Sequence, residues 1–479
     1  MSVAELPAGA TRGFPVRALR IVIFSGLIAL GFVPSLGQGL QQLAFAAVLT
    51  SCVLRVVDEP RLPVFAAFEL GVALVVLGDG LVGPTVVPNV ADATLDAARR
   101  YLVVATAVVI VTHELVLHRL RTRDAATASP PARQPRSIEG SPKARIVLVI
   151  LTAILLWRYV PAAFRAARVG RLGLIEADDS GGETGALTAI LNPLYQGLAM
   201  MLPALWVSWF GARRRWMAAM VALPILATLL ALTTRYVLLI AASGFLLTAH
   251  LTKRMALRYA GIAAVSLSMA SWVVAATRSE GIANVLSLDT LRSSSNRLLG
   301  SEGVLRTVAQ IMDYTGTSGL RGGASHVSVM LFWVPRAMWS GKPTLLGYWF
   351  PREYGLTGFS AGFSAAASFA EDALADFGFL GGVIVLALVG AGFAYYEARG
   401  VRRLEATVWG PAFVGCSFGL AYFAARSMST ALINAVGMVA IGLLVSRLTR
   451  PPTPIGPATP TAPPPHARSS TAVAHGGDT

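Results

Sequence analysis

Residues able to transfer protons are scarce in the stretch 277–377, which separates two groups of apolar runs. His326, within GGASHVSV, is its only histidine. An imidazole whose ordinary pKa is about 6.5 suits a general base near neutral pH. Glu371, within SFAEDALADF, is the alternative base. Both residues also have structural explanations, because His326 can be packed or face lipid headgroups and Glu371 can favour the positive end of a helix dipole.

Cations form a second candidate group, one suited to an anion. Arginine presents a planar set of donors that binds phosphate in a bidentate manner, and it stays charged. The stretch 277–377 contains Arg278, Arg292, Arg297, Arg306, Arg321, Arg336, Lys342 and Arg352, while Arg235 and Arg426 lie in short turns between apolar runs. Several such side chains together predict a diphosphate site, although any one of them can instead reach lipid headgroups or pair with loop acids.

Aromatic residues are mixed with these cations. They are Phe332, Trp333, Trp339, Tyr348, Trp349 and Tyr354. Their rings can stack on the apolar faces of pyranose sugars, and they can equally belong to an interfacial aromatic belt. Pro335 and Pro343 are expected to hold the segment FWVPRAMWSGKP (332–343) in non-helical, extended geometry.

Composition determines which elements must position these residues. The 479-residue chain is 54% hydrophobic and only 14% charged, with a mean hydropathy of +0.62. Apolar runs near the length of roughly 18–20 residues that crosses a bilayer recur along it. They occur at 19–37, 40–57, 62–78, 101–117, 146–163, 188–210, 217–233, 236–252, 259–276, 378–396, 406–424 and 430–446. We therefore predict an all-α polytopic membrane protein with about twelve transmembrane helices.

The organisation follows from these runs. We expect a cytoplasmic N-terminus (1–18), transmembrane helices one to nine (19–276), a large, partly helical extracytoplasmic loop (277–377), helices ten to twelve (378–446) and a disordered cytoplasmic tail (447–479). Clusters of Lys and Arg, including Arg17, Arg20 and Arg55, then share one side of the membrane, which places both termini in the cytoplasm. The formal charge of +15 is explained by this topology and does not require a nucleic-acid partner.

Two segments of the loop have recognisable patterns. The stretch 301–314 places Val304, Val308 and Ile311 on one helical face, which predicts an amphipathic helix near the membrane surface with Ser301 as its N-cap. The apolar run 326–334 is too short to span a membrane, so it is expected to be re-entrant or interfacial.

The stretch 332–343, followed by SAAASFAEDALADFGFLGGVIVLALVGAGFAY (364–395), resembles the oligosaccharide repeat-unit polymerases of the O-antigen, or Wzy, type. In that family a long outer loop carries a hydrophobic–Pro–Arg…Lys–Pro element, and an acidic signature leads into the next span. The matching positions are Pro335, Arg336, Lys342, Pro343, Glu371, Phe377, Gly378 and Gly381. The family's Ser–Arg–Gly turn is matched in TTRY (233–236) only by Arg235.

Such polymerases are similar to other lipid-linked glycosyltransferases of the GT-C kind. The resemblance implies transfer of a growing glycan from undecaprenyl diphosphate to another lipid-linked repeat unit on the outer face of the bacterial cytoplasmic membrane, in surface polysaccharide or exopolysaccharide biosynthesis for the cell envelope. No cofactor or metal is expected, because fixed cations can stabilise the leaving diphosphate. The expected partners are the lipid-linked oligosaccharide and the bilayer, a chain-length regulator protein is a candidate partner, and no nucleic acid is expected.

The resemblance and the residues together assign roles. Arg235 and Arg336 are the preferred diphosphate contacts, with Arg278, Lys342 and Arg352 as second choices. Either His326 or Glu371 would take the proton of the acceptor hydroxyl. Trp333, Trp339, Tyr348, Trp349 and Tyr354 would stack on sugars. The segment 332–343 would then be a lid or wall of the site.

Two alternatives stay open. A ligase that moves finished glycan onto a different acceptor would use much the same arginines. A transporter of polysaccharide or lipid-linked sugar would be expected to pair ionisable residues near the bilayer midplane. Glu69, inside the third run, is one intramembrane carboxylate of the kind used in proton coupling.

HELVLH (113–118) is not a zinc motif, because its histidines are five positions apart instead of four.

Overall fold

The protein is described here by a computed structural model. The structure describes residues 14–58, 64–78, 90–126, 141–180, 186–210, 215–231, 235–252, 303–335, 338–353, 367–401, 404, 407 and 409–449. All regular elements within these ranges are helical. The predicted all-α class is therefore confirmed for this part of the chain.

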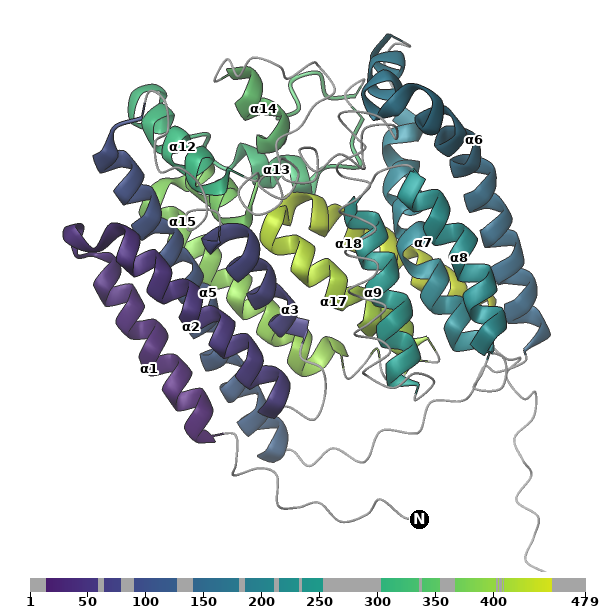
Figure 1. Cartoon of the computed structure of the whole chain (residues 1–479), viewed down its shortest axis with the longest axis horizontal. Coiled ribbons are helices and arrows are strands. Elements are labelled where there is room, and N and C mark those ends of the chain that lie inside the picture. Colours follow the sequence, from purple (N-terminus) through teal and green to yellow (C-terminus); the bar gives the residue numbers. More distant parts are fainter. Residues whose placement is uncertain are drawn as a thin grey trace, which may run out of the picture.

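The long helices stand side by side as a bundle (Figure 1). One side is formed by α1 (Phe14–Gly31), α2 (Gly37–Asp58), α3 (Val64–Gly71), α5 (Asp92–Ala126) and α15 (Phe369–Tyr395). The other contains α6 (Pro142–Ser180), α7 (Ala186–Phe210), α8 (Arg215–Ala231) and α9 (Arg235–Leu251), with α17 (Gly410–Arg426) and α18 (Met428–Leu448) between the two sides. A short 3₁₀ helix, η1 (Pro34–Leu36), joins α1 to α2, and two π-helices, η2 (Val72–Leu77) and η5 (Tyr396–Gly400), continue α3 and α15.

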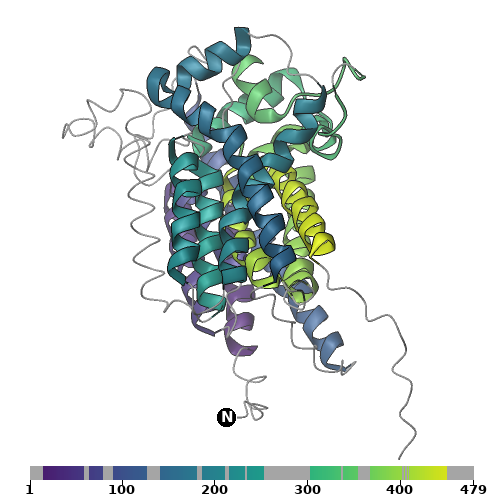
Figure 2. The same cartoon turned by 90° about the vertical axis from the view of Figure 1, so that its right-hand side faces the viewer.

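Three further helices gather over one end of this bundle. They are α12 (Val304–Ser318), α13 (Ala324–Met330) and α14 (Leu346–Glu353). Figure 2 shows the same arrangement from the side, with these helices at one end of the bundle. The loop between the two groups of apolar runs thus contributes a helical layer, which we name the cap (described residues 303–353).

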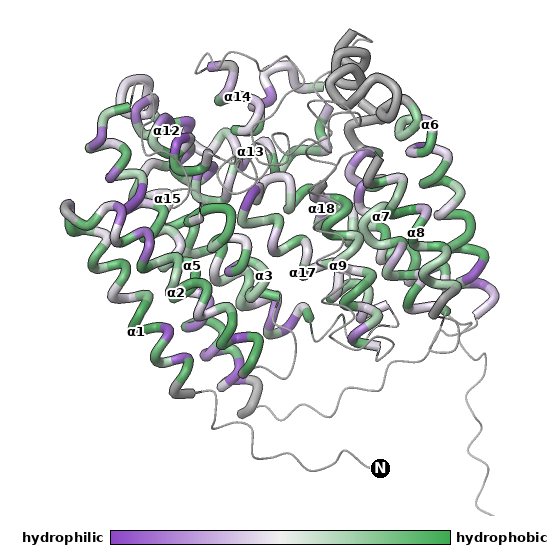
Figure 3. The backbone as a smooth tube through the Cα atoms, viewed as in Figure 1, coloured by the Kyte–Doolittle hydropathy of each residue, from purple (hydrophilic) through white to green (hydrophobic). Residues whose placement is uncertain are grey.

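Five helices are long and apolar enough to cross a membrane. They cover Gly37–Val57, Asp92–Arg123, Pro142–Phe164, Phe369–Gly400 and Met428–Leu448, and Val64–Leu77, Met217–Leu229 and Tyr236–Leu251 are shorter apolar helices. Most of the bundle helices are hydrophobic along much of their length (Figure 3). These features identify a membrane protein. Each predicted run except 259–276, which lies outside the described residues, overlaps a helix, but the number of spans stays a prediction.

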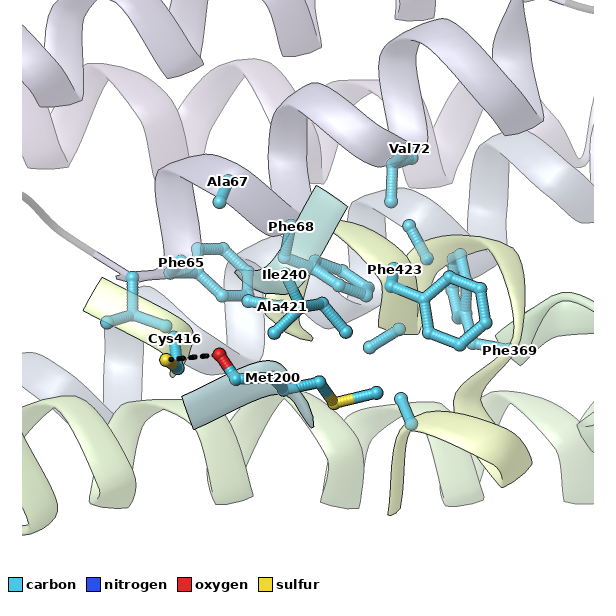
Figure 4. Close-up of a cluster of buried hydrophobic side chains, with 14 of the residues drawn as sticks. Phe65, Ala67, Phe68, Val72, Met200, Ile240, Phe369, Cys416, Ala421 and Phe423 are labelled. Carbon is cyan, nitrogen blue, oxygen red and sulfur yellow. Dashed lines mark hydrogen bonds between the residues drawn. The ribbon is translucent and has the colours of Figure 1, made fainter. Parts of the chain in front are cut away.

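Small residues let the bundle helices approach one another closely. A Cβ added to Gly437 of α18 would lie 2.0 Å from the carbonyl oxygen of Pro193 on α7. On α17, the same addition to Gly419 would lie 2.1 Å from Ser243 Oγ of α9. Near these contacts Cys416 Sγ lies 3.4 Å from the carbonyl oxygen of Met200, within a core that also contains Phe65, Phe68 and Phe423 (Figure 4).

The amphipathic helix expected around 301–314 exists as α12, but protein covers its apolar face. Val304, Val308 and Ile311 are buried, and α12 packs against α5 and α15. Gly303, with φ of 59°, is the N-cap, and Ser301 lies outside the described residues. The hydrophobic side of this helix is therefore used for attaching the cap to the bundle.

Two arginines that were expected to mark the cytoplasmic side are buried within the bundle. Arg20 and Arg55 are 3% and 0% exposed. Arg55 Nε lies 3.0 Å from Glu69 Oε2, and its Nη2 lies 2.5 Å from Glu114 Oε1. The charges of these arginines are therefore compensated by carboxylates inside the protein.

Candidate functional site

A histidine and an aspartate meet where the cap contacts the bundle. His326 lies in α13 and Asp376 near the start of α15. His326 Nδ1 lies 2.7 Å from Asp376 Oδ2, and the backbone N–H of His326 donates to the same oxygen at 3.1 Å. The histidine side chain is 32% exposed whereas the aspartate is fully buried. Because the Nδ1 proton is donated to Asp376, Nε2 is the ring nitrogen that can accept a proton from a substrate.

Asp376 is held by two further side chains. Ser325 Oγ donates to Asp376 Oδ1 at 3.0 Å. Arg321 Nη1 donates to Ser325 Oγ at 2.5 Å and lies 4.0 Å from Asp376 Oδ1. The carboxylate is thus fixed by several donors, which in turn fixes the orientation of the imidazole ring.

The hydrogen bond that His326 donates to Asp376 raises the pKa of His326, and the negative charge of Asp376 acts in the same direction, whereas partial burial opposes it. Because a base with a higher pKa has a stronger affinity for a proton, Asp376 makes His326 a better proton acceptor. Burial lowers the pKa of Arg321, but an arginine starts so far above neutrality that it stays charged.

Backbone geometry brings α13 onto α15. Gly322 and Gly323, with φ of 60° and 87°, adopt the left-handed region just before α13 begins. Gly378, with φ of 69° and ψ of −169°, interrupts the helical backbone inside α15. The backbone N–H of Arg321 donates to the carbonyl oxygen of Ala375 at 3.0 Å, one turn before that interruption. The ring of Phe377 lies 5.1 Å from that of His326.

The Arg321 guanidinium also connects the pair to the predicted aromatic segment. Its Nη2 donates to the carbonyl oxygen of Thr344 at 2.7 Å, and its Cζ lies 4.3 Å from the ring centre of Trp349. Tyr314 contacts Trp349 edge-on, with ring centres 5.3 Å apart. One face of Trp349 is therefore covered by Arg321, so this ring supports the arginine.

Lys342 shapes the segment 332–343. Its Nζ donates to the carbonyl oxygens of Phe332 and Val334, both at 2.9 Å. The backbone N–H groups of Met338 and Trp339 both bond to the Pro335 carbonyl oxygen. The described residues of the segment form turns and no helix, so the prediction of non-helical geometry is confirmed for them. The prediction that the segment is extended was wrong, because Lys342 bonds back to the start of the segment.

Glu371 forms a capping box with Ser368 at the start of α15. The Glu371 N–H donates to Ser368 Oγ at 3.3 Å, and the Glu371 carboxylate accepts from the Ser368 N–H. Glu371 is fully buried. Its neighbour Asp372 accepts a hydrogen bond from Ser429 of α18. The structure thus joins His326 to Asp376, and it does not bring Glu371 to the exposed imidazole.

Several predicted site residues fall outside the described part of the chain. Arg278, Arg336 and Tyr354 are among these, and for Arg235 and Arg352 only the backbone is described. Arg235 begins α9, and the next residue, Tyr236, stacks on Phe423 near the end of α17. Since α18 follows α17 and its Ser429 bonds Asp372, the Arg235 backbone lies at the same end of the bundle as His326.

Three more predicted sugar-stacking residues are at the surface of the cap. Trp333 and Tyr348 are 54% and 40% exposed, and Trp339 is half-buried. No group of three or more His, Cys, Asp or Glu side chains able to hold a metal ion occurs among the residues that the structure describes.

Sequence reasoning did not identify Asp376 or Arg321 as members of the site. Asp376 shared a weak signal with Glu371, namely a carboxylate near a helix entrance, and Arg321 was one of several loop arginines. Only the pairing across separate helices distinguishes them. Comparison of the chain with family models, curated proteins and solved structures gives no match.

Proposed function

We propose that this protein is a membrane glycosyltransferase of the repeat-unit polymerase type, which joins lipid-linked oligosaccharides. The observation that carries the proposal is the 2.7 Å contact between His326 Nδ1 and Asp376 Oδ2, in a region that carries the motif resemblance. A partly exposed histidine that is oriented by a buried carboxylate has the arrangement of a general base.

In this mechanism His326 Nε2 takes the proton of an acceptor sugar hydroxyl. The hydroxyl oxygen forms a bond to the anomeric carbon of the donor glycan, and the bond from that carbon to the diphosphate oxygen breaks. Undecaprenyl diphosphate leaves with the bonding electrons, and the proton stays on the imidazole until it passes to solvent. Asp376 stabilises the imidazolium that forms.

The leaving diphosphate requires fixed positive charge. Arg235 and Arg336 are the proposed contacts, and Arg278, Lys342 and Arg352 are the second choices. The Arg235 backbone lies at the end of the bundle that carries His326, which is compatible with this assignment. Lys342 Nζ already donates to two backbone carbonyls, so a contact with the diphosphate would compete with these hydrogen bonds.

The remaining features of the proposal concern the membrane. Twelve spans, with both termini in the cytoplasm of a bacterium, would place the cap on the outer face of the cytoplasmic membrane. The exposed rings of Trp333 and Tyr348 would then contact sugars of the lipid-linked substrate.

A transporter of lipid-linked sugar is a second candidate, because the buried ion pairs of Arg55 with Glu69 and Glu114 are of the kind that such proteins contain. The two functions differ in what accumulates when the protein is removed. We would measure polyprenyl-diphosphate-linked glycans by mass spectrometry in a strain lacking the protein, and separately in whole cells and on their outer surface.

Single repeat units accumulating on the outer surface are the result expected for a polymerase. Repeat units retained inside would instead identify a transporter, and accumulation of long lipid-linked polymer would identify a ligase. An unchanged pool would contradict all three functions.

Variants then test the site. His326→Gln should abolish polymer while the protein stays in the membrane, and Val327→Ala, on the exposed side of the same short helix, is the matched control. Arg235→Ala and Arg336→Ala should abolish polymer as well. Full activity in both arginine variants would remove the diphosphate assignment.

A further inference from the structure

A second group of ionisable side chains lies inside the bundle, away from the cap. It is formed by five elements: Arg20 of α1, Ser51 and Arg55 of α2, Glu69 of α3, His113 and Glu114 of α5, and Glu397 of η5. We name this group the inner cluster. Because α15 begins at the cap and η5 follows its far end, the inner cluster and the His326 site lie at opposite ends of one helix (Figure 1).

Most charges of the inner cluster are balanced in pairs. Arg55 contacts both oxygens of Glu69, with its Nε at 3.0 Å and its Nη2 at 3.1 Å. Ser51 Oγ donates to Glu69 Oε1 at 2.9 Å. Arg20 Nη1 lies 3.4 Å from Glu114 Oε1, which also accepts from Arg55. Two arginines therefore compensate two carboxylates.

Glu397 is the carboxylate that remains. Its Oε2 lies 2.9 Å from His113 Nε2, and the two side chains are 8% and 0% exposed. An ionised glutamate beside a neutral histidine would add one uncompensated negative charge to a buried site, which is strongly unfavourable. One proton shared by the two residues removes that charge, whether it resides on the imidazole or on the carboxyl group.

Other charged or titratable groups near the pair do not replace this proton. Arg17 of α1 attracts the Glu397 carboxylate, but Arg17 and Arg399 of η5 are only half-buried, so solvent weakens the effect of their charges. On α2, Cys52 Sγ donates to the carbonyl oxygen of Ala66 at 3.2 Å. The ring of Phe65 stacks on His113, with centres 3.7 Å apart, and also lies under Arg55, so an apolar surface covers one side of the pair.

Buried polar atoms around the pair indicate that water belongs to the site. Within the described residues, His113 Nδ1, Glu397 Oε1, Glu114 Oε2, Arg55 Nη1 and Arg20 Nε have no hydrogen-bond partner. Buried polar atoms are almost always satisfied, and internal water does this where protein groups do not. Water that bridges these atoms would also give the proton a route for exchange.

Backbone geometry at the inner cluster is also unusual. The π-helix η5 contains Glu397, and the π-helix η2 begins one residue after α3, which carries Glu69. π-helical turns are rare and are frequently found at functional sites. Two of them at one group of buried charges are a second observation that points to a ligand.

We infer that the His113–Glu397 pair is a proton-binding site within the membrane bundle, holding one exchangeable proton at neutral pH inside a hydrated group of ion pairs. The site is independent of glycan chemistry. The ligand of this site is a proton, and the site lies at the end of α15 away from the cap.

Infrared difference spectroscopy of the full chain in lipid nanodiscs tests this inference. Spectra are compared between pH values, first in H₂O and then in D₂O. The wild-type protein should show a protonated carboxyl or imidazolium signal at neutral pH that shifts in D₂O and depends on Glu397. Glu397→Gln should lose it, whereas in His113→Gln the buried carboxyl group should keep the proton alone and its band should shift. Asp96→Asn, which removes a carboxylate of α5 that is paired with Arg99 at 2.7 Å and 42% exposed, should retain it.

A wild-type spectrum indistinguishable from that of Glu397→Gln in this comparison would overturn the inference. Stability gives a second measurement that does not depend on a spectral assignment. Loss of the proton at high pH leaves a buried negative charge in the wild type, whereas glutamine stays neutral. The melting temperature of the wild type should therefore fall more steeply above neutral pH than that of Glu397→Gln, and parallel curves would contradict the inference.

Discussion

His326 Nδ1 and Asp376 Oδ2 lie 2.7 Å apart although the two residues are separated by 50 positions in the chain. The contact joins the short helix α13 to the beginning of α15, and the histidine side chain is 32% exposed. Because the carboxylate also accepts from Ser325 and from the His326 N–H, it controls both the tautomer and the position of the imidazole.

Replacing Asp376 by Asn should therefore change the pH dependence of activity as well as its rate. A general base works in its neutral form, so wild-type activity should be lost as pH falls through the raised pKa of His326. In Asp376→Asn that pKa falls, and the acidic limb should move to lower pH while the maximal rate drops roughly 100-fold or more. Polymer formation by membranes over a pH series measures both changes.

An unchanged acidic limb with a reduced rate would mean that Asp376 only supports the fold. Ser325→Ala is the control. It removes a donor to Asp376 but leaves the carboxylate in contact with His326, so the pH at which activity is lost should shift less.

Glu371 offers a test that separates capping from catalysis. Glutamine preserves a capping box, because its side-chain carbonyl accepts the same hydrogen bond, whereas it cannot act as a base. Glu371→Gln should keep its activity, and Glu371→Ala and Ser368→Ala should each lose about 1 kcal/mol of stability. Thermal unfolding in detergent, together with polymer formation, measures these effects. A Glu371→Gln protein that is stable and inactive would restore the glutamate as the base.

Gly378 should tolerate substitution poorly. Its φ of 69° lies in the left-handed region, where an L side chain costs about 1–2 kcal/mol. Gly378→Ala should therefore lower stability by that amount and also reduce activity, because the same interruption of α15 positions Asp376 and the carbonyl that binds Arg321. Gly392→Ala on the same helix, where an added Cβ meets nothing within 4 Å, is the matched control and should retain both properties.

Arg321 and Trp349 should be energetically coupled. The guanidinium carbon lies 4.3 Å from the ring centre, and a cation–π contact of this kind contributes about 1 kcal/mol. A double-mutant cycle with Arg321→Met and Trp349→Leu, measured by thermal unfolding of the protein, should give a coupling energy near that value. Additivity within about 0.3 kcal/mol would show that the contact does not contribute.

Local patterns in the sequence were sufficient for much of the fold. The apolar runs predicted helices, and each run that the structure describes lies on one. The pattern of Val304, Val308 and Ile311 predicted α12, and His326 was identified as a candidate base because it is the only histidine of its region. These conclusions depend on composition and on helical periodicity, and both can be determined from a single sequence.

The tertiary structure decided which residues meet. Nothing in the sequence distinguishes Asp376 from Glu371 as the partner of His326, because both lie near the start of one helix. In the sequence, Arg20 and Arg55 looked like cationic residues that mark the cytoplasmic side of a membrane protein. In the structure they pair with Glu69 and Glu114 inside the bundle. Contacts between separate helices depend on how glycines, kinks and side chains let those helices pack, and that information is distributed over the whole chain instead of lying in any one segment.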